Sequence, residues 1–404
     1  MQFDFGALRR FPDVEGEGLG ASDAADRLLL DEAAARLASA GPDEVVVIDD
    51  AYGAIALGAA AAGARGIRVH QDTITGERAL AENARRFRLA GDEVPVSRPL
   101  GAELVAGARL VLLRLPRSLD RLDELAGLVA RHAASDAVIV AAGRIKHMSL
   151  AMNEVLGTWF GRVDVSHARQ KSRVLTASGP LGLETRPAGA PRPAPVDSDT
   201  DAVSASVSES HEPGGGWPRE QRDPEVGLTV VAHGGVFAGT GVDIGTRFLL
   251  GRLGAAVPDA ASAVDLACGS GVVAAWLARE RPGVVVRASD RSAAAAASAR
   301  LTAAANGVAD RVQVTQADGL EHLGDASERL VVLNPPFHSD AALHTGIAAH
   351  LFADAARVLE PGGELWCVWN SHLRYRPLLE RVVGPTRQVA RNAKFTVTAS
   401  RRTP

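Results

Sequence analysis

The same pattern of apolar runs occurs twice along the chain, and this repeat constrains the fold more than any other feature. Each half alternates short apolar runs, which are typical of buried strands, with stretches of helical character. The predicted strands lie at residues 45–49, 66–70, 110–113 and 137–141 in the first half, and at 263–266, 284–288, 312–316, 330–333 and 364–369 in the second. Strands that alternate with helices in this way form parallel, doubly wound sheets. The sequence therefore predicts two α/β domains in tandem.

A stretch of different composition separates the two halves. With 404 residues, the chain is too long for one ordinary hydrophobic core. Between residues 186 and 222 the apolar pattern stops, and Pro, Ala, Ser, Gly and acidic residues dominate. This composition predicts a disordered linker between a first domain at 1–185 and a second domain at 223–404. An acidic tether that mimics nucleic acid is the alternative interpretation.

The charge of the chain is unevenly distributed. Residues 186–225 hold eight acids and four arginines, so this segment carries the same net charge of −4 as the whole chain. Residues 371–404, in contrast, hold eight basic residues and one acid. A basic surface can bind the phosphates of a nucleic acid, although charge runs also occur on ordinary solvated faces. In the first half, RNA docking is suggested in the same way by Arg144, Lys146, Arg162, Arg169, Lys171 and Arg173.

The composition excludes several classes of protein. A hydrophobic content of 46% and a charged content of 23% are typical of soluble globular proteins. The N-terminus lacks the basic and apolar regions of a signal peptide, and the apolar run 54–64 is too short to span a bilayer. Cys268 and Cys367 are the only cysteines, which excludes a disulfide framework and a four-thiolate zinc site. We therefore expect a cytoplasmic protein without membrane or metal partners, and we expect it to act as a monomer.

In the second half, the residues that follow the predicted strands are suited to bind a nucleoside, because ligands of doubly wound folds lie beyond the carboxyl ends of the strands. The first strand leads into a turn in which Gly269 and Gly271 allow a ligand to approach the backbone. Asp290 ends the second strand and could accept from ribose hydroxyls, and Asp318 follows the third and could accept from an adenine amino group. Both acids could instead cap helices. The turn lacks the third glycine of the dinucleotide fingerprint, which favours a cofactor without phosphates over NAD.

The fourth strand ends at Asn334-Pro335-Pro336-Phe337-His338, which is suited to hold a planar group that carries an amino group. Two consecutive prolines fix the backbone and remove two backbone donors. Asn334 supplies a side-chain acceptor, and Phe337 supplies a flat apolar face. The alternative is a rigid turn after a strand, because Asn-Pro often opens turns.

The first half lacks parts of this constellation. The correspondences suggested by the sequence are Asp49–Gly53 with 265–269, Ile55 with Gly271, Asp72 with Asp290 and Arg114 with Asn334. A β-branched side chain at Ile55 would obstruct the approach of a ligand to the backbone. Arg114 cannot supply the acceptor that Asn334 provides. The first half is therefore predicted to be a non-catalytic copy.

Together these motifs resemble those of class I S-adenosylmethionine-dependent methyltransferases that modify amino groups. The segment 236–245, Val-Phe-Ala-Gly-Thr-Gly-Val-Asp-Ile-Gly, is similar to one found in the bacterial rRNA guanine 2-amino methyltransferases. Members of this family carry a degenerate N-terminal methyltransferase copy and a catalytic C-terminal copy. The loop Asp49–Gly53 resembles the Asn-Asp-Ala-Phe-Gly loop of the large-subunit type. The resemblance covers both domains, and the long linker is its main departure.

The resemblance implies tandem Rossmann-like domains, each with a mixed seven-stranded sheet and helices on both faces. It implies S-adenosylmethionine as cofactor and ribosomal RNA, free or in an assembling subunit, as partner. The implied reaction is methyl transfer to the 2-amino group of a guanosine, with the large-subunit type favoured over the small-subunit type.

The resemblance also implies roles for individual residues. Asn334 and the carbonyl of Pro335 would accept the amino hydrogens, and Phe337 would stack on an unpaired or flipped base. The expected catalytic residues are Asn334, Pro335, Pro336 and Phe337, and Phe337 is also expected to bind substrate. His338 could contact the base or backbone, and the alternative is a loop histidine without a ligand role. Independently of the resemblance, Asn370 is a candidate for substrate contact because it lies at the end of its strand. The expected cofactor-binding residues are Asp265, Cys268, Gly269, Gly271, Asp290, Arg291, Asp318, Gly319, Thr240 and Asp243. Thr240 and Asp243 could instead cap a helix.

Two other functions fit parts of this pattern. A methyltransferase of another amino or amide group, such as a glutamine of a release factor or an adenine in DNA, is the alternative enzyme. Such enzymes more often carry Tyr after the two prolines, and they lack the tandem copy. A non-catalytic RNA-binding protein is the alternative outside enzymes, and it would leave an intact cofactor constellation unused.

Overall fold

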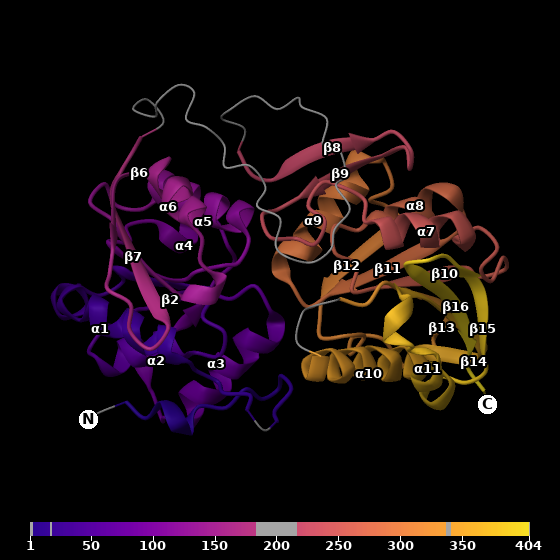
Figure 1. Cartoon of the computed structure of the whole chain (residues 1–404), viewed down its shortest axis with the longest axis horizontal. Helices are drawn as coiled ribbons and strands as arrows, with labels where there is room; N and C mark the ends of the chain where they lie inside the picture. Colours follow the sequence, from indigo (N-terminus) through magenta and orange to yellow (C-terminus); the bar gives the residue numbers. More distant parts are fainter. Residues whose placement is uncertain (1–2, 17, 183–215, 337–340, 404) are drawn as a thin grey trace. The chain divides into compact units, whose positions relative to one another are not determined.

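The computed structural model describes residues 3–16, 18–182, 216–336 and 341–403. The chain divides into two compact units, Met1–Trp217 and Pro218–Pro404. Each unit is built around its own sheet, with helices on both sides (Figure 1). Within the described residues, no helix has both the length and the apolar character needed to cross a membrane.

The first unit is organised around a buried central strand. Its strands are β1 (Val45–Ile48), β2 (Arg68–His70), β3 (Val96–Ser97), β4 (Leu110–Arg114), β5 (Val138–Arg144), β6 (Phe160–Val165) and β7 (Ser172–Pro180). Its helices are α1 (Ala24–Ser39), α2 (Ala54–Ala61), α3 (Ile74–Arg86), α4 (Ala102–Val105), α5 (Leu119–His132) and α6 (Leu150–Gly157). Val45 and Val47 pack under α1, α2 and α3, whereas Val46 and Ile48 pack under α4, α5 and α6. This alternation explains why β1 is apolar at every position, since both of its faces are buried.

The second unit repeats this arrangement. Its sheet contains β10 (Ser262–Leu266), β11 (Val285–Asp290), β12 (Val312–Gln316), β13 (Glu328–Leu333), β14 (Leu359–Asn370), β15 (Thr386–Arg391) and β16 (Phe395–Arg401). Its helices are α7 (Ile244–Leu253), α8 (Val272–Glu280), α9 (Ala293–Ala305), α10 (Ala341–Val358) and α11 (Arg376–Val382). One core lies between the sheet and α7, α8 and α9, and the other lies between the sheet and α10 and α11 (Figure 1).

The two sheets have the same topology. The strand order is β3-β2-β1-β4-β5-β7-β6 in the first unit and β12-β11-β10-β13-β14-β16-β15 in the second. The five strands from β3 to β5, and from β12 to β14, pair in parallel. The strand next to them, β7 or β16, is antiparallel to both of its neighbours. The predicted fold, two Rossmann-like domains with mixed seven-stranded sheets, is confirmed.

The linker predicted at 186–222 extends too far toward the C-terminus. Most of it lies outside the described residues, but Arg219–Asp223 form strand β8, which pairs with β9 (Leu228–Ala232) in an antiparallel hairpin. The backbone of β9 is held by one polar face of α9. Thr302 Oγ1 accepts from the N–H of Val231 at 3.0 Å and donates to its carbonyl at 3.1 Å. The hairpin therefore fixes the start of the segment 233–243, which leads to α7.

The loop after the first strand has the same length in both units, and this corrects the correspondence expected from the sequence. Residues 49–53 connect β1 to α2, and residues 267–271 connect β10 to α8. Gly53 and Gly271 are the N-cap residues of these helices, with left-handed φ values of 92° and 78°. The counterpart of Gly271 is thus Gly53, and the prediction that Ile55 replaces it is wrong. Sequence matching pairs like residues with like residues, whereas helix packing sets the true register.

The end of the second strand requires a similar correction. Ile48 pairs with His70, and Leu266 pairs with Ser289, so the residue that follows in each unit is Gln71 or Asp290. The predicted match of Asp72 with Asp290 is therefore wrong by one position. The match of Arg114 with Asn334 is confirmed by the sheet register, because both follow the strand residue that pairs with the end of the central strand.

Candidate active site

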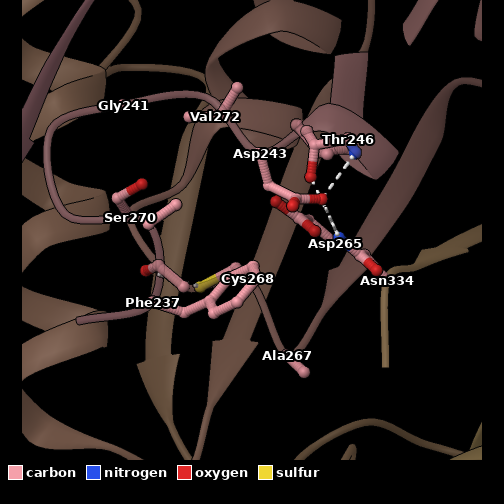
Figure 2. Close-up of a pocket in the computed structure, with 13 residues that line it drawn as sticks. Phe237, Gly241, Asp243, Thr246, Asp265, Ala267, Cys268, Ser270, Val272 and Asn334 are labelled. Carbon is pink, nitrogen blue, oxygen red and sulfur yellow. Dashed lines mark hydrogen bonds between the residues drawn. The ribbon is translucent and has the colours of Figure 1, made fainter. Parts of the chain in front are cut away.

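A pocket lies at the carboxyl ends of β10 and β13, where the segment 237–243 passes over the turn before α8 (Figure 2). The residues that line it are Phe237, Ala238, Gly241, Asp243, Thr246, Asp265, Ala267, Cys268, Gly269, Ser270, Val272, Val273 and Asn334. Five of the predicted site residues are therefore brought together in one hollow: Asp243, Asp265, Cys268, Gly269 and Asn334. Within the part of the chain that the structure describes, no cluster of side chains could hold a metal ion.

The two glycines of the turn have different roles. Gly269 has a φ of 54°, and a Cβ added to it would meet no atom within 4 Å, so the space in front of it is open. A Cβ on Gly271, in contrast, would lie 2.7 Å from Cα of Ala299 on α9. Gly269 therefore leaves room for a ligand, whereas Gly271 allows α8 to pack closely against α9.

Cys268 belongs to this turn, and Asp265 precedes it in β10. Burial, with a contribution from the charges of Asp290 and Asp265, raises the pKa of the Cys268 thiol well above its usual value, which makes it a poor nucleophile. The carboxylate of Asp265 accepts from the backbone N–H of Ala274 at 2.9 Å, in the first turn of α8. Burial and the charge of Asp290 raise the pKa of Asp265 to about 7. Asp265 therefore links β10 to the first turn of α8, on either side of the glycine turn.

Asp290 joins the turn to the end of β11. Its carboxylate accepts from the N–H of Gly269 at 2.9 Å and from the N–H of Ser292 at 2.9 Å. These bonds place a carboxylate directly beside the open space in front of Gly269. The next residue, Arg291, accepts from Gln316 Nε2 through its carbonyl at 3.2 Å, which ties the loop to β12.

Asp318 and Gly319 follow β12 and lie beside α10. His350 Nε2 is 3.7 Å from the Asp318 carboxylate, and the interaction with this carboxylate raises the pKa of His350. Gly319 has a φ of 60°, and a Cβ there would lie 2.1 Å from an oxygen of Asp354. Gly319 is therefore favoured by its left-handed backbone and by the Asp354 side chain that lies against it. Neither residue is part of the pocket lining, and their assignment to the cofactor stays a prediction.

Asn334 is anchored to the N-terminus of α7 through both hydrogens of its amide (Figure 2). Its Nδ2 donates to Asp243 Oδ2 at 3.2 Å and to Thr246 Oγ1 at 3.0 Å. Asp243 is also the N-cap of α7, since Oδ2 accepts from the N–H of Thr246 at 3.0 Å. A carboxylate can only accept, so the amide must turn its NH2 group toward Asp243. The oxygen of Asn334 is consequently directed away from α7.

Among the described residues, that oxygen has no hydrogen-bond partner. Asn334 Oδ1 is shielded from solvent and accepts no hydrogen bond, and the same is true of Oδ1 of Asn370 at the end of the adjacent strand β14. Pro335, immediately after Asn334, is buried, and Pro336 is half-buried. Phe337 and His338, which we expect to contact the base, lie outside the described residues.

The remaining predicted cofactor residue, Thr240, does not line the pocket. Its hydroxyl donates to Gln221 Oε1 of β8 at 3.1 Å, and the cap of α7 is Asp243. Phe237, in contrast, lies beside Cys268 with 57% of its surface exposed (Figure 2). An exposed aromatic ring at the mouth of a pocket is suited to cover a ligand.

Thr246 is a site residue that the sequence pattern does not single out. It lies in the first turn of α7 and is 8% exposed, and a buried threonine in a helix is common in any domain. The available signal is its spacing of three residues from Asp243, which places a hydroxyl next to the carboxylate on one side of the helix N-terminus.

The first unit has closed the corresponding positions with ion pairs. Arg114, the counterpart of Asn334, binds Asp26 and donates to Asp23 at 2.8 Å. Asp23 is the N-cap of α1 and Asp26 lies three residues on, as Asp243 and Thr246 do on α7. Asp49, at the position of Ala267, pairs with the buried Arg121 at 3.1 Å. In the first unit these charged side chains thus pair with one another, whereas in the second unit Oδ1 of Asn334 has no partner among the described residues.

Comparisons with known proteins divide the chain into the same two units. The family model described as "RLMG N-terminal domain" matches residues 1–180, and the one described as "Methyltransferase small domain" matches residues 227–399. In overall structure, the chain is similar to the 16S rRNA N2 methyltransferase RsmC of T. thermophilus, solved in complex with AdoMet and guanosine. The TM-score is 0.70 at 21% identity, over 94% of this chain and 92% of that one.

Full-length relatives are more similar in sequence. The ribosomal RNA large subunit methyltransferase G of Streptomyces avermitilis is 34% identical over 97% of this chain and 95% of its own length. The protein of the same name from Pseudomonas paraeruginosa is 33% identical over 96% of each chain. The chain belongs to the ribosomal RNA large subunit methyltransferase G family.

Proposed function

We propose that the protein transfers the methyl group of S-adenosylmethionine to the exocyclic 2-amino group of a guanosine in the ribosomal RNA of the large subunit. Family membership supports the type of substrate. The observation that carries the proposal is the amide of Asn334, whose two hydrogens are taken by α7 and whose oxygen is a buried acceptor without a partner. A substrate on ribosomal RNA also implies a cytoplasmic location.

The residues present fit the proposed cofactor. The open space in front of Gly269 admits a ligand to the backbone, and Asp290 is held beside that space by the N–H groups of Gly269 and Ser292. Each carboxylate oxygen can accept more than one hydrogen bond, so Asp290 can also receive ribose hydroxyls. Asp243 lines the other side of the pocket, where its charge suits an ammonium group. We propose that Asp318 accepts from the adenine amino group.

When bound, S-adenosylmethionine supplies an electrophilic methyl group on a positively charged sulfur. The 2-amino nitrogen of guanine is a poor nucleophile, because its lone pair is delocalised into the ring. We propose that Asn334 Oδ1 and the carbonyl of Pro335 accept its two hydrogens, which directs the lone pair toward the methyl group. These acceptors also stabilise the positive charge that develops on the nitrogen. After transfer, one of the two protons leaves to water.

Much of the rate enhancement would then come from positioning of the amino group for in-line attack. The anchoring of Asn334 by Asp243 and Thr246 supports this, because an amide fixed at both hydrogens keeps its oxygen in place. We further propose that Phe337 stacks on the base.

The decisive experiment replaces Asn334 by Ala. The substrate is protein-free large-subunit rRNA from a strain that lacks this enzyme, and the methyl donor is radiolabelled S-adenosylmethionine. We expect the rate of methyl transfer to fall by roughly 100- to 1000-fold. Binding of S-adenosylmethionine, measured by calorimetry, should persist, because the glycine turn and Asp290 are unchanged. An Asn334→Ala enzyme that methylates this rRNA at the wild-type rate would exclude the assignment.

A further inference from the structure

Two buried amide oxygens without partners lie at the carboxyl ends of adjacent strands in the second unit. They belong to Asn334, which follows β13, and to Asn370, the last residue of β14. Among the described residues of this unit, no other side-chain amide has a buried oxygen without a partner. Such acceptors are rare in folded proteins, because a carbonyl removed from water without a hydrogen bond costs free energy. Two of them on neighbouring strands call for a ligand with two donors.

Both amides lie on the same face of the sheet. Leu333 pairs with Cys367, so Asn334 is level with Val368, and Asn370 lies two residues further along the neighbouring strand. Residues two apart on a strand share a face, and Asn334 itself contacts α7 on that face. On the other side of β14, Asn370 pairs with Phe395, which belongs to the core under α7. A Cβ on Gly245 of α7 would lie 3.0 Å from the Phe395 ring. The two amides thus flank one end of α7.

The Watson–Crick edge of guanine matches this pair of acceptors. Guanine presents two neighbouring donors, N1–H and the 2-amino group, followed by the acceptor O6. Adenine presents an acceptor at N1 instead. An asparagine side chain offers one acceptor and one NH2 donor, so it can accept from N1–H while its NH2 group faces O6.

We propose that Oδ1 of Asn370 accepts the N1–H of the target guanine, while Oδ1 of Asn334 accepts from its 2-amino group. Asn370 is then the residue that selects guanine over purines that carry a 2-amino group but no N1–H. This inference rests on the proposed methyl transfer, and it adds the recognition of the base edge. Asn334 serves the reacting nitrogen, and Asn370 serves the atom next to it.

The test uses a base analogue that separates the two contacts. The methylated guanosine is first mapped by mass spectrometry of rRNA digests, and an RNA that spans it is prepared with either guanine or 2,6-diaminopurine at that position. 2,6-Diaminopurine keeps the 2-amino group, but its N1 is an acceptor. The wild-type enzyme should prefer guanine by roughly 10- to 100-fold in kcat/KM, the discrimination typical of a good bidentate contact to a base.

Variants of Asn370 assign this preference. Asn370→Ala should lower the preference to near unity, mainly by slowing the reaction with guanine. Asn370→Asp should lower it as well, because a carboxylate oxygen then replaces the NH2 group that faces O6. Thermal unfolding and calorimetry with S-adenosylmethionine check that both variants fold and bind the cofactor. Equal rates of the wild type on both RNAs, or an unchanged preference in Asn370→Ala, would overturn the inference. If the wild type fails to methylate the guanine RNA, the proposed function itself is wrong.

Discussion

The side chain of Asn334 shows how a single amide acquires a direction. An isolated asparagine can rotate by 180° and exchange oxygen for nitrogen at little cost. Here the carboxylate of Asp243 excludes the oxygen, and the hydroxyl of Thr246 takes the second hydrogen. Thr246 is therefore a positioning residue for the proposed reaction, because it acts on substrate only through Asn334.

The role of Thr246 can be separated from a purely structural one. Thr246→Val removes the hydroxyl but leaves the backbone N–H that Asp243 caps, so the helix terminus should be preserved. We expect kcat to fall roughly three- to tenfold, as for the loss of one hydrogen bond, with little change in KM for S-adenosylmethionine. Thr246→Ser should restore kcat, because it keeps the acceptor.

A matched control for this change exists in the same unit. Thr398 on β16 is fully buried, and its hydroxyl has no hydrogen-bond partner. Thr398→Val is the same substitution without a lost contact, and we expect an unchanged kcat and an equal or higher Tm. A Thr246→Val enzyme that behaves like Thr398→Val would contradict the positioning role.

Asp265 should make the stability of the second unit depend on pH. Its pKa is raised from the ordinary value of 3.8 to about 7, chiefly by burial. Because the unfolded chain releases this proton more readily, the folded state loses stability as the pH rises from about 4 through 7. Asp265→Asn keeps an acceptor for Ala274 and removes the charge. We expect its stability relative to wild type to increase by up to roughly 2–3 kcal/mol between pH 5 and pH 8. Denaturant titrations of the cofactor-free protein at both pH values measure this, and a difference independent of pH would refute it.

At the scale of elements, both units preserve the turn that connects the central strand to the next helix, β1 to α2 and β10 to α8. In both units it spans five residues and ends in a left-handed glycine. A Cβ on Gly53 would lie 2.8 Å from the tip of the Leu80 side chain, and one on Gly271 would lie 2.7 Å from the backbone of Ala299. A side-chain tip can move aside, whereas the backbone of α9 cannot without shifting the helix.

The same substitution should therefore have unequal effects at these two positions. We expect Gly271→Ala to lower Tm more than Gly53→Ala and to weaken S-adenosylmethionine binding, because α8 is displaced from the turn. Gly53→Ala should retain methyl transfer, since the strain is confined to the first unit. Differential scanning calorimetry and cofactor titrations of the two variants provide the comparison. Equal losses of Tm would show that the close approach to α9 is relieved by other movements.

The sequence predicts the fold well where strands are buried on both faces. The runs at 110–113 and 330–333 are continuous apolar stretches, and they lie within β4 and β13. Strand β8 could not be found in this way, because Arg219–Asp223 is polar at every position. Its order comes from pairing with β9 and from side-chain contacts with distant residues, such as that of Asp223 with Arg247.

Sequence reasoning reaches part of the candidate site and misses its connections. The position of Asn334 follows from a strand end and two prolines, which are local signals. The contact between Asn334 and Thr246 joins residues 88 positions apart, and no local pattern encodes it. The register of the repeat has no local signal either. Asp50, in the loop after β1, and Asp265, within β10, both accept from the third residue of the helix that follows. The two aspartates therefore share a role but do not occupy matching positions.

At the scale of the whole molecule, the two units keep one architecture and differ in which side chains end the strands. Asp290 at the end of β11 corresponds to Gln71, and Asn334 corresponds to Arg114. In the first unit, the side chain of Gln71 donates to the carbonyl of Asp50, so it closes onto its own turn. These contacts give a physical reason for a non-catalytic first copy.

We therefore expect S-adenosylmethionine to bind once per chain, in the second unit. Asp290→Ala should weaken this binding by roughly 10- to 100-fold, because a charged acceptor for ribose hydroxyls is lost. Gln71→Ala, the change at the matching position of the first unit, should leave both affinity and stoichiometry as in the wild type. Isothermal titration measures both quantities. A second binding event per chain, or equal effects of the two variants, would contradict the assignment of the first copy.

Gly53, the N-cap of α2, shows what a duplicated domain retains after it has lost its activity. Gly53 persists in the copy whose strand ends are closed by ion pairs, where its left-handed φ of 92° favours glycine. A duplicated domain that loses its chemistry is thus free to change its strand-end acceptors, whereas a left-handed position continues to favour glycine. The glycine in the turn therefore shows only that a copy keeps the fold, whereas the residues at the strand ends show whether it keeps the reaction.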